Sequence, residues 1–143
     1  MTIRACDNSH LQGLTALEKD CFSLPWNEGL LAGTLARVDF VGYVIEEQNE
    51  LLGYICGTSL FETAEVARVA VRSAHRRKGL GEKLLTAFLE KAKEKGAEQV
   101  FLEVRASNVP AMRLYEKLGF VKWRLRPKYY ADGEDGQEMI KRL

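Results

Sequence analysis

One stretch of the sequence decides the fold: Val69-Ala70-Val71-Arg72-Ser73-Ala74-His75-Arg76-Arg77-Lys78-Gly79-Leu80-Gly81. It joins a β-branched run to a basic loop, two glycines and an amphipathic helix pattern that starts at Leu80. Glycines let backbone N–H groups approach a ligand closely, and a helix N-terminus offers unpaired N–H donors and the positive end of its dipole. Arg76, Arg77 and Lys78 add charge at the same point. The stretch predicts a pyrophosphate cradle, although an ordinary strand–turn–helix connection with solvated cations fits the same residues.

Length and composition favour one globular domain over residues 1–143. Apolar residues make up 46% and charged residues 29%, which is ordinary for such a domain. No apolar run approaches membrane-spanning length and the N-terminus lacks a signal pattern, so we expect a cytoplasmic protein without a membrane partner. Neither a disulfide framework nor a metal site is indicated by the widely spaced Cys6, Cys21, Cys56, His10 and His75.

The charge is distributed unevenly along the chain. Residues 1–67 hold three basic and ten acidic side chains, whereas residues 68–143 hold eighteen basic and ten acidic ones. An uneven solvated surface would explain this. A basic side for an anionic cofactor and an acidic side for a cationic substrate would explain it too. Nucleic-acid binding is not expected, because only the basic stretch 122–128 favours it.

Apolar periodicity predicts seven strands and four helices. The predicted strands are Thr2–Cys6, Asp39–Glu47, Leu51–Leu60, Val66–Val71, Gln99–Val104, Phe120–Arg126 and Glu138–Arg142. The predicted helices run from Asn8 or Ser9 to Cys21, onward from Asn27, from Leu80 to Gly96, and from Pro110 to Leu118. In residues 120–126 the alternation predicts a buried face formed by Val121, Trp123 and Leu125.

A carboxylate interrupts the apolar strand Phe101-Leu102-Glu103-Val104. Leu102 and Val104 point to one face of the strand, and Glu103 points to the other. A buried carboxylate is costly unless it is paired or partly hydrated. Glu103 is therefore either half of an ion pair, with Arg105 or Arg68, or a general base with a raised pKa.

The segment after this strand places a tyrosine on a helix. Ser107 or Asn108 can cap the helix. Because seven residues make nearly two helical turns, one side of this helix carries Asn108, Ala111, Tyr115 and Leu118. Tyr115 then either fills the core with a satisfied hydroxyl or lies beside Glu103 as a functional phenol.

Several motifs resemble those of one known family. The cradle Arg76-Arg77-Lys78-Gly79-Leu80-Gly81 resembles the acetyl-CoA signature Q/R-x-x-G-x-G/A of the GNAT acetyltransferases. Nearly the whole chain resembles one subfamily, the RimI-type N-terminal alanine acetyltransferases that modify a small-subunit ribosomal protein. The segments that carry this are Phe22-Ser23-Leu24-Pro25-Trp26, Phe101-Leu102-Glu103-Val104-Arg105-Ala106-Ser107-Asn108, Leu114-Tyr115-Glu116-Lys117-Leu118-Gly119-Phe120 and Lys128-Tyr129-Tyr130.

The resemblance implies an α+β three-layer fold, with a mixed, mostly antiparallel central sheet flanked by helices. It implies acetyl-CoA as co-substrate, no metal, and a protein N-terminus as acceptor, whose amine attacks the thioester directly without an acyl-enzyme. Glu103 would be the general base and Tyr115 the general acid. The cofactor would be held by main-chain groups of Val69, Ala70 and Val71, by the amides of Arg77, Lys78, Gly79, Leu80, Gly81 and Glu82, and by Asn108.

Some alternatives stay open. Glu65 is a rival base, because other branches of the family place a glutamate on that strand. The acceptor could be a lysine or a small amine, and a non-catalytic acyl-CoA-binding module would need neither Glu103 nor Tyr115. The chain also departs from the subfamily pattern at Arg68, His75 and Lys128. Arg68 and Lys128 leave the identity of the acceptor more open than the assignment of the catalytic residues.

Overall fold

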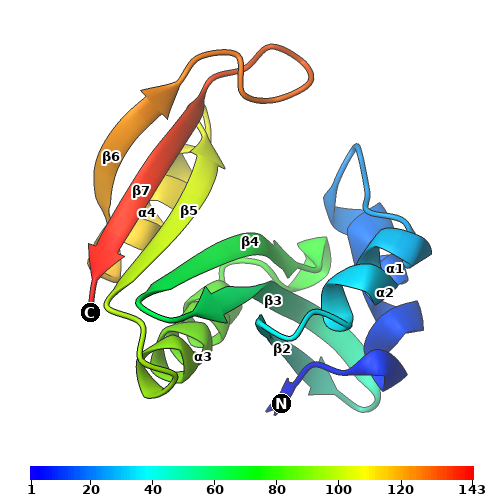
Figure 1. The fold of residues 1–143 in the computed structure, drawn as a ribbon. Coiled ribbons are helices and arrows are strands. Elements are labelled where there is room, and N and C mark those ends of the chain that lie inside the picture. The colour runs from blue at the N-terminus through cyan, green and yellow to red at the C-terminus, as the bar shows by residue number, and fades with distance from the viewer.

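The computed structural model describes residues 1–143 as one seven-stranded sheet with four α-helices (Figure 1). The strand order is β1-β2-β3-β4-β5-β7-β6, and every neighbouring pair is antiparallel except β4 and β5. The strands are β1 Thr2–Ala5, β2 Phe40–Glu47, β3 Glu50–Leu60, β4 Thr63–Val71, β5 Gln99–Arg105, β6 Val121–Arg126 and β7 Gly136–Arg142. The helices are α1 Leu11–Cys21, α2 Glu28–Leu35, α3 Leu80–Glu94 and α4 Val109–Lys117, with short 3-10 turns at Asn8–His10 and Ser73–His75.

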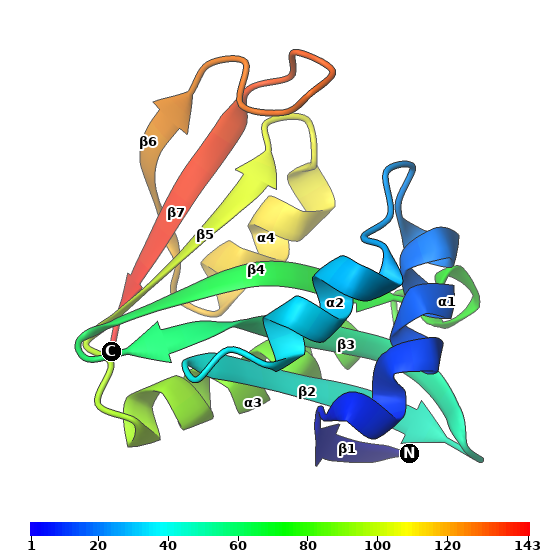
Figure 2. The same cartoon turned by 45° about the vertical axis from the view of Figure 1, so that its right-hand side comes forward.

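The helices cover both faces of the sheet, as the family resemblance implies. In Figure 2, α1 and α2 lie in front of the strands, and α3 passes behind them. Leu14, Leu17 and Leu31 of α1 and α2 pack against one face with Tyr54. Residues of α3 and α4 pack against the other face in the larger core. The sheet therefore separates two surfaces, one backed by α1 and α2 and the other by α3 and α4.

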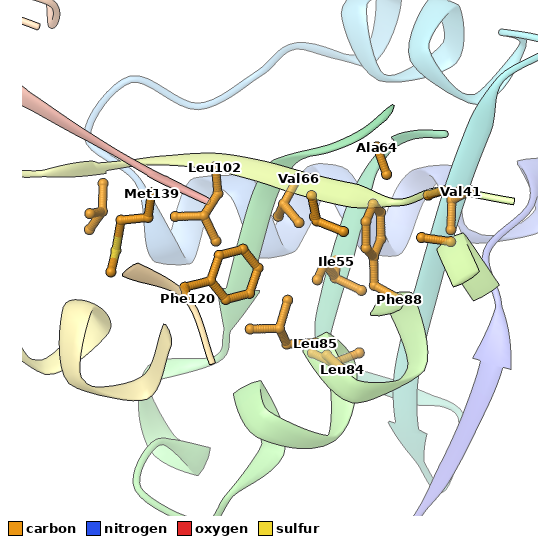
Figure 3. Packing of buried hydrophobic residues seen from close by; sticks show 14 of the residues in the cluster. Val41, Ile55, Ala64, Val66, Leu84, Leu85, Phe88, Leu102, Phe120 and Met139 are labelled. Carbon is orange, nitrogen blue, oxygen red and sulfur yellow. The ribbon is translucent and has the colours of Figure 1, made fainter. Parts of the chain in front are cut away.

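The larger core is built on α3. Phe88, Leu84 and Leu85 are fully buried and lie against Ile55 and Leu102 of the sheet (Figure 3). Their spacing follows the helical period, so one stripe of α3 faces the strands. This packing fixes where the first turn of α3 lies relative to the end of β4.

A bulge bends β4 at the centre of the sheet. Cys56 pairs with Arg68 and Gly57 with Val66, so Ala67 is an extra residue on β4. Gly57 permits this, because a Cβ at that position would lie 1.9 Å from the Glu65 carbonyl oxygen. Bulges increase the local twist of a strand. The pairing of β4 with β5 ends at the same point.

Two predictions about local structure were wrong. The first helix is capped by Asp7 rather than by Asn8 or Ser9: the Asp7 carboxylate accepts from the Ser9 N–H at 2.9 Å, and a 3-10 turn leads into α1. Asp7 can do this because its backbone is extended.

The predicted buried face of residues 120–126 is also absent. Val121, Trp123 and Leu125 are 60%, 51% and 50% exposed. β6 is an edge strand, and a bulge between Lys122 and Arg124 breaks its alternation, so Val121 and Leu125 point to opposite faces. None of the helices is both long and apolar enough to cross a membrane.

Candidate active site

The candidate site lies where the two central strands separate. β4 and β5 pair only from Thr63–Gln99 to Val66–Leu102, and then β4 continues to Val71 and β5 to Arg105 without pairing. Beyond Val66, main-chain groups on the β5 side of β4 therefore have no strand partner. The predicted pantetheine-binding residues Val69, Ala70 and Val71 belong to this unpaired segment. The Val71 carbonyl already accepts from Arg76 Nε at 3.0 Å.

The predicted cradle connects β4 to α3. Arg77 and Gly79 both have left-handed backbones, with φ of 65° and 78°. Gly79 is the N-cap residue of α3, and no side chain caps the helix there. A Cβ on Gly79 would meet nothing within 4 Å, so this glycine serves the backbone conformation and not the packing. The first N–H groups of α3 are thus left without a side-chain partner, as an anion-binding N-terminus requires.

The other predicted cradle residues differ in what they present. Leu80 is buried in the core, so only its main chain can serve a ligand. Glu82 is held by an ion pair with Lys117 at 3.0 Å. A Cβ on Gly81 would lie 3.3 Å from Leu114, so Gly81 also allows α3 to approach α4. Lys78 is exposed.

Glu103 belongs to a cluster of four charged side chains on β5, β6 and β7, hereafter the Glu103 cluster: Glu103, Arg126, Glu138 and Arg124. Glu103 Oε1 lies 3.0 Å from Arg126 Nε. Arg126 Nη2 also donates to Glu138 at 3.2 Å, and Arg124 Nε donates to Glu138 at 2.6 Å. The predicted pairing of Glu103 with Arg105 or Arg68 is therefore wrong. Arg105 instead bonds Asp132 and Glu134 of the β6–β7 loop.

One oxygen of Glu103 has no partner. Its Oε2 is buried and makes no hydrogen bond in the protein. Burial raises the pKa of the Glu103 carboxyl above its usual range, Arg126 opposes this shift, and Glu138 and Glu65 add to it. Glu138 lies directly across from Glu103 on β7, so two carboxylates share one face. A free oxygen with a raised pKa is what a general base near neutral pH requires.

Tyr115 lies across β5 from Glu103. Its ring packs on the core that holds Leu102 and Val104, whereas Glu103 points to the α1–α2 face. The ring lies in the core, with Phe120 at 6.0 Å between ring centroids, and not beside Glu103 on the same face of β5. Burial raises the pKa of the Tyr115 hydroxyl to about 12, so it keeps its proton at neutral pH. Tyr130 adds to the rise in the pKa of Tyr115, and the pKa of Tyr130 is itself raised first by burial and then by Glu103.

Asn108 and Glu65 are both exposed at the surface of the protein. The Asn108 side chain accepts from the Ala111 N–H at 3.2 Å and caps α4, as predicted, and the residue is exposed. Glu65 lies on β4 opposite Phe101 and shares the face of Glu103, but it is exposed and makes no ion pair.

The three residues that depart from the subfamily pattern differ in their surroundings. Arg68 pairs with the fully buried Glu18 at 2.7 Å. His75 ends the 3-10 turn before the cradle and is half-buried. Lys128 has a left-handed backbone in the exposed β6–β7 loop, where its N–H donates to Asp135 at 3.0 Å.

Sequence reasoning missed the partners of Glu103. Arg124 and Arg126 alternate with the three side chains that were predicted to be buried, and Glu138 was predicted only to begin the last strand. The alternation of Gly136, Glu138 and Ile140 places Glu138 on one face, but which strand lies beside it depends on the sheet order. No local pattern carries that information.

The site and fold define a class of protein. The model of the Acetyltransferase (GNAT) family matches residues 11–120, and the chain belongs to this family. The mixed seven-stranded sheet with helices on both faces is the GNAT fold. The chain is an N-acetyltransferase, in agreement with its relatives.

Two relatives are similar to this chain over most of its length. The [ribosomal protein bS18]-alanine N-acetyltransferase of Escherichia coli is 28% identical over 137 residues, which cover 96% of this chain and 91% of that protein. The crystal structure of that E. coli enzyme superposes with a TM-score of 0.92, covering 99% of this chain and 93% of the other. An N-alpha-acetyltransferase of Sulfurisphaera tokodaii is 40% identical over 110 residues, 68% of this chain and 66% of the relative.

A third protein shares the fold alone. Arabidopsis thaliana NAA60 in complex with acetyl-CoA superposes with a TM-score of 0.89 at 17% identity, covering 99% of this chain and 98% of the other.

Proposed function

We propose that the protein transfers the acetyl group of acetyl-CoA to the N-terminal α-amine of a protein, and that the acceptor is the N-terminal alanine of a small-subunit ribosomal protein. The observation that carries the proposal is the free, buried Oε2 of Glu103 at the opening between β4 and β5. The names of the E. coli and S. tokodaii relatives support the acceptor class. We place the reaction in the cytoplasm, where ribosomal proteins are made.

The residues at the opening fit acetyl-CoA. The unpaired main chain of Val69, Ala70 and Val71 would bind the pantetheine arm as a neighbouring strand would. The amides from Arg77 to Glu82, at the uncapped start of α3, would bind the pyrophosphate. Asn108 would contact the cofactor only from its capping position on α4. When bound, the cofactor supplies the thioester carbonyl that the amine attacks.

Glu103 is the general base of the proposed mechanism. The acceptor ammonium gives a proton to Glu103, directly or through one water, and the neutral nitrogen forms a bond to the acetyl carbon. An α-amine with a pKa of 7.7–8.0 costs only about 1–1.4 kcal/mol to deprotonate at pH 7, whereas a lysine near 10.4 costs about 4.6 kcal/mol. One carboxylate with a raised pKa therefore suits an α-amine better than a lysine.

Tyr115 is the general acid. As the carbon–sulfur bond breaks, the electron pair goes to sulfur, and the Tyr115 hydroxyl donates its proton to the thiolate. The new amide nitrogen then loses its second proton, which returns to the Tyr115 phenolate through solvent. Its position on the face opposite Glu103 separates the two proton transfers across the opening. Cys56 is not a nucleophile here, because it is buried and its thiol pKa is raised to about 12 by burial.

The test is to incubate the protein with acetyl-CoA and peptides that begin with Ala, Ser, Met or a blocked residue, and to locate the acetyl group by mass spectrometry. We expect modification of the free α-amine, fastest on Ala, and none on the blocked peptide. Acetylation of a lysine in the blocked peptide would instead indicate a side-chain acceptor.

A further inference from the structure

A second buried cluster of charged and polar side chains lies where α1 packs on β3 and β4. It consists of Glu18, Arg68 and Tyr54 and is hereafter the Glu18 cluster. Glu18 of α1 has no exposed surface, and both of its oxygens are bonded. Oε1 accepts from Arg68 Nη2 at 2.7 Å, Oε2 accepts from Arg68 Nε at 3.1 Å, and the Tyr54 hydroxyl also donates to Oε2. This is a two-pronged arginine–carboxylate pair in a dry site, the strong form of such a contact.

The cluster binds the loop between α1 and α2. Glu18 accepts from the Trp26 main-chain N–H at 2.8 Å, and Arg68 donates to the Leu24 carbonyl at 3.3 Å. The Arg68 guanidinium also lies over two rings of the same loop, 3.6 Å from the Phe22 centroid and 4.6 Å from the Trp26 centroid. Segment 22–26 contains no helix or strand, and Arg68 holds it on β4 together with Glu18 and the apolar packing of Phe22 and Trp26.

The loop lies on the face that the acceptor must use. Glu65 and Glu103 point to the α1–α2 face, whereas Val66 and Leu102 point to the core under α3. Tyr115 and the cradle lie on the α3–α4 side. An amine that gives its proton to Glu103 therefore comes from the α1–α2 face. In Figures 1 and 2 the α1–α2 loop and the β6–β7 loop stand on either side of the separation between β4 and β5.

Arg68 connects the loop 22–26 to β4, one of the two strands that border the opening. It lies on β4 next to the bulge residue Ala67, in the segment that has left β5. Its backbone therefore belongs to the opening and its side chain fixes the loop. A small side chain at this position would leave Glu18 buried and unpaired and would leave the loop free to move.

We propose that Arg68, through its bonds to Glu18 and to the loop 22–26, is a positioning residue that holds this loop as one wall of the acceptor site. The inference rests on the proposed function, because the wall matters only if an amine enters from this face. Arg68 makes no hydrogen bond or ion pair with Glu103 or Tyr115, because its bonds go to Glu18 and Leu24. Its loss therefore acts on acceptor binding before it acts on the chemical step.

The test compares Arg68→Met and Arg68→Lys with the matched pair Arg37→Met and Arg37→Lys. Arg37 also forms a two-pronged bond, to Asp39, but outside this site. We expect Arg68→Met to raise the KM for an Ala-initiated peptide about 10-fold or more, because the loop must then be ordered on binding. The acetyl-CoA dissociation constant should stay within about 2-fold. Arg68→Lys keeps the charge but not the fork, so its KM should be intermediate.

Hydrogen exchange provides a second measurement that does not need Arg68→Met to fold. In the wild type the Trp26 amide should exchange slowly, since it is bonded to a buried carboxylate, and Arg68→Lys should speed its exchange. Equal peptide KM and equal Trp26 exchange in wild type and Arg68→Lys would overturn the role of Arg68. A wild-type enzyme that modifies none of the peptides would contradict the proposed function itself, and this inference with it.

Discussion

The two charge clusters contain the same kind of pair, a glutamate and an arginine from different elements, but they satisfy the glutamate differently. Both oxygens of Glu18 are bonded, and the side chain has no exposed surface. Glu103 has one oxygen in an ion pair with Arg126 and one without a partner, and it lies beside a second carboxylate, Glu138. A carboxylate with every lone pair occupied stabilises the fold, whereas one that keeps a free oxygen remains available to take a proton.

The largest expected effect is on turnover, from Glu103→Gln. The amide keeps the shape and a hydrogen-bonding oxygen but loses the proton acceptor, so kcat at neutral pH should fall about 10²–10⁴-fold. The defect should shrink as the pH rises past the α-amine pKa of about 8, because the acceptor then arrives neutral. Comparison of pH–rate profiles with those of Glu65→Gln checks this. A larger, pH-sensitive defect in Glu65→Gln would move the base to Glu65.

Glu18→Gln should affect stability instead. It leaves Arg68 charged in a mostly buried site, and breaking such a pair costs about 3–5 kcal/mol. Urea unfolding of the variant measures this loss. The control is Glu46→Gln, whose partner Arg4 is well exposed, and which should cost about 0–1 kcal/mol. Equal losses in the two variants would show that burial does not distinguish the Glu18 cluster.

Tyr115→Phe extends the comparison to the hydroxyl of a half-buried tyrosine. Because the hydroxyl is needed only when the thiolate leaves, kcat should fall about 10²-fold while the acetyl-CoA dissociation constant changes little. Tyr43→Phe is the control, since Tyr43 packs against the same core from β2 and should retain normal turnover. A normal kcat in Tyr115→Phe would leave Tyr115 with only a packing role.

Lys78→Ala should have a smaller effect than either cluster variant. Lys78 is exposed, and the cradle offers main-chain N–H groups at the start of α3, so the lost charge should cost about 1 kcal/mol of acetyl-CoA binding at most. Titration calorimetry at low and high salt measures it. A loss of all detectable binding would show that side-chain charge holds the cofactor instead of the backbone.

The smallest effect concerns stability and pH at Glu103. Since the pKa of Glu103 is higher in the folded protein, this group binds more protons in the folded state than in the unfolded one, and its own contribution to the free energy of unfolding falls as the pH rises above about 4.3. Glu103→Gln removes this fall. Its melting temperature should exceed that of the wild type slightly at pH 7 and match it at pH 4. A variant that is less stable at pH 7 would give Glu103 the same structural role as Glu18.

The sequence by itself determined the order of the helices and strands and the identity of the main residues of the candidate site. The strand ending at Val71, the basic loop, Gly79 and the amphipathic helix are local features, and periodicity over one or two turns reveals them. Glu103 also stood out locally, because a charge between Leu102 and Val104 is costly. The GNAT fold followed from the same motifs.

Only the tertiary structure decided what those groups touch. Arg126 reaches Glu103 because β7 lies between β5 and β6, an order that residues far apart in the chain establish together. Arg68 meets Glu18 because the β4 bulge and the packing of α1 on the sheet bring them together. Alternation within a strand determines which side chains share a face, but register and sheet order determine their partners, and these depend on packing across the whole domain.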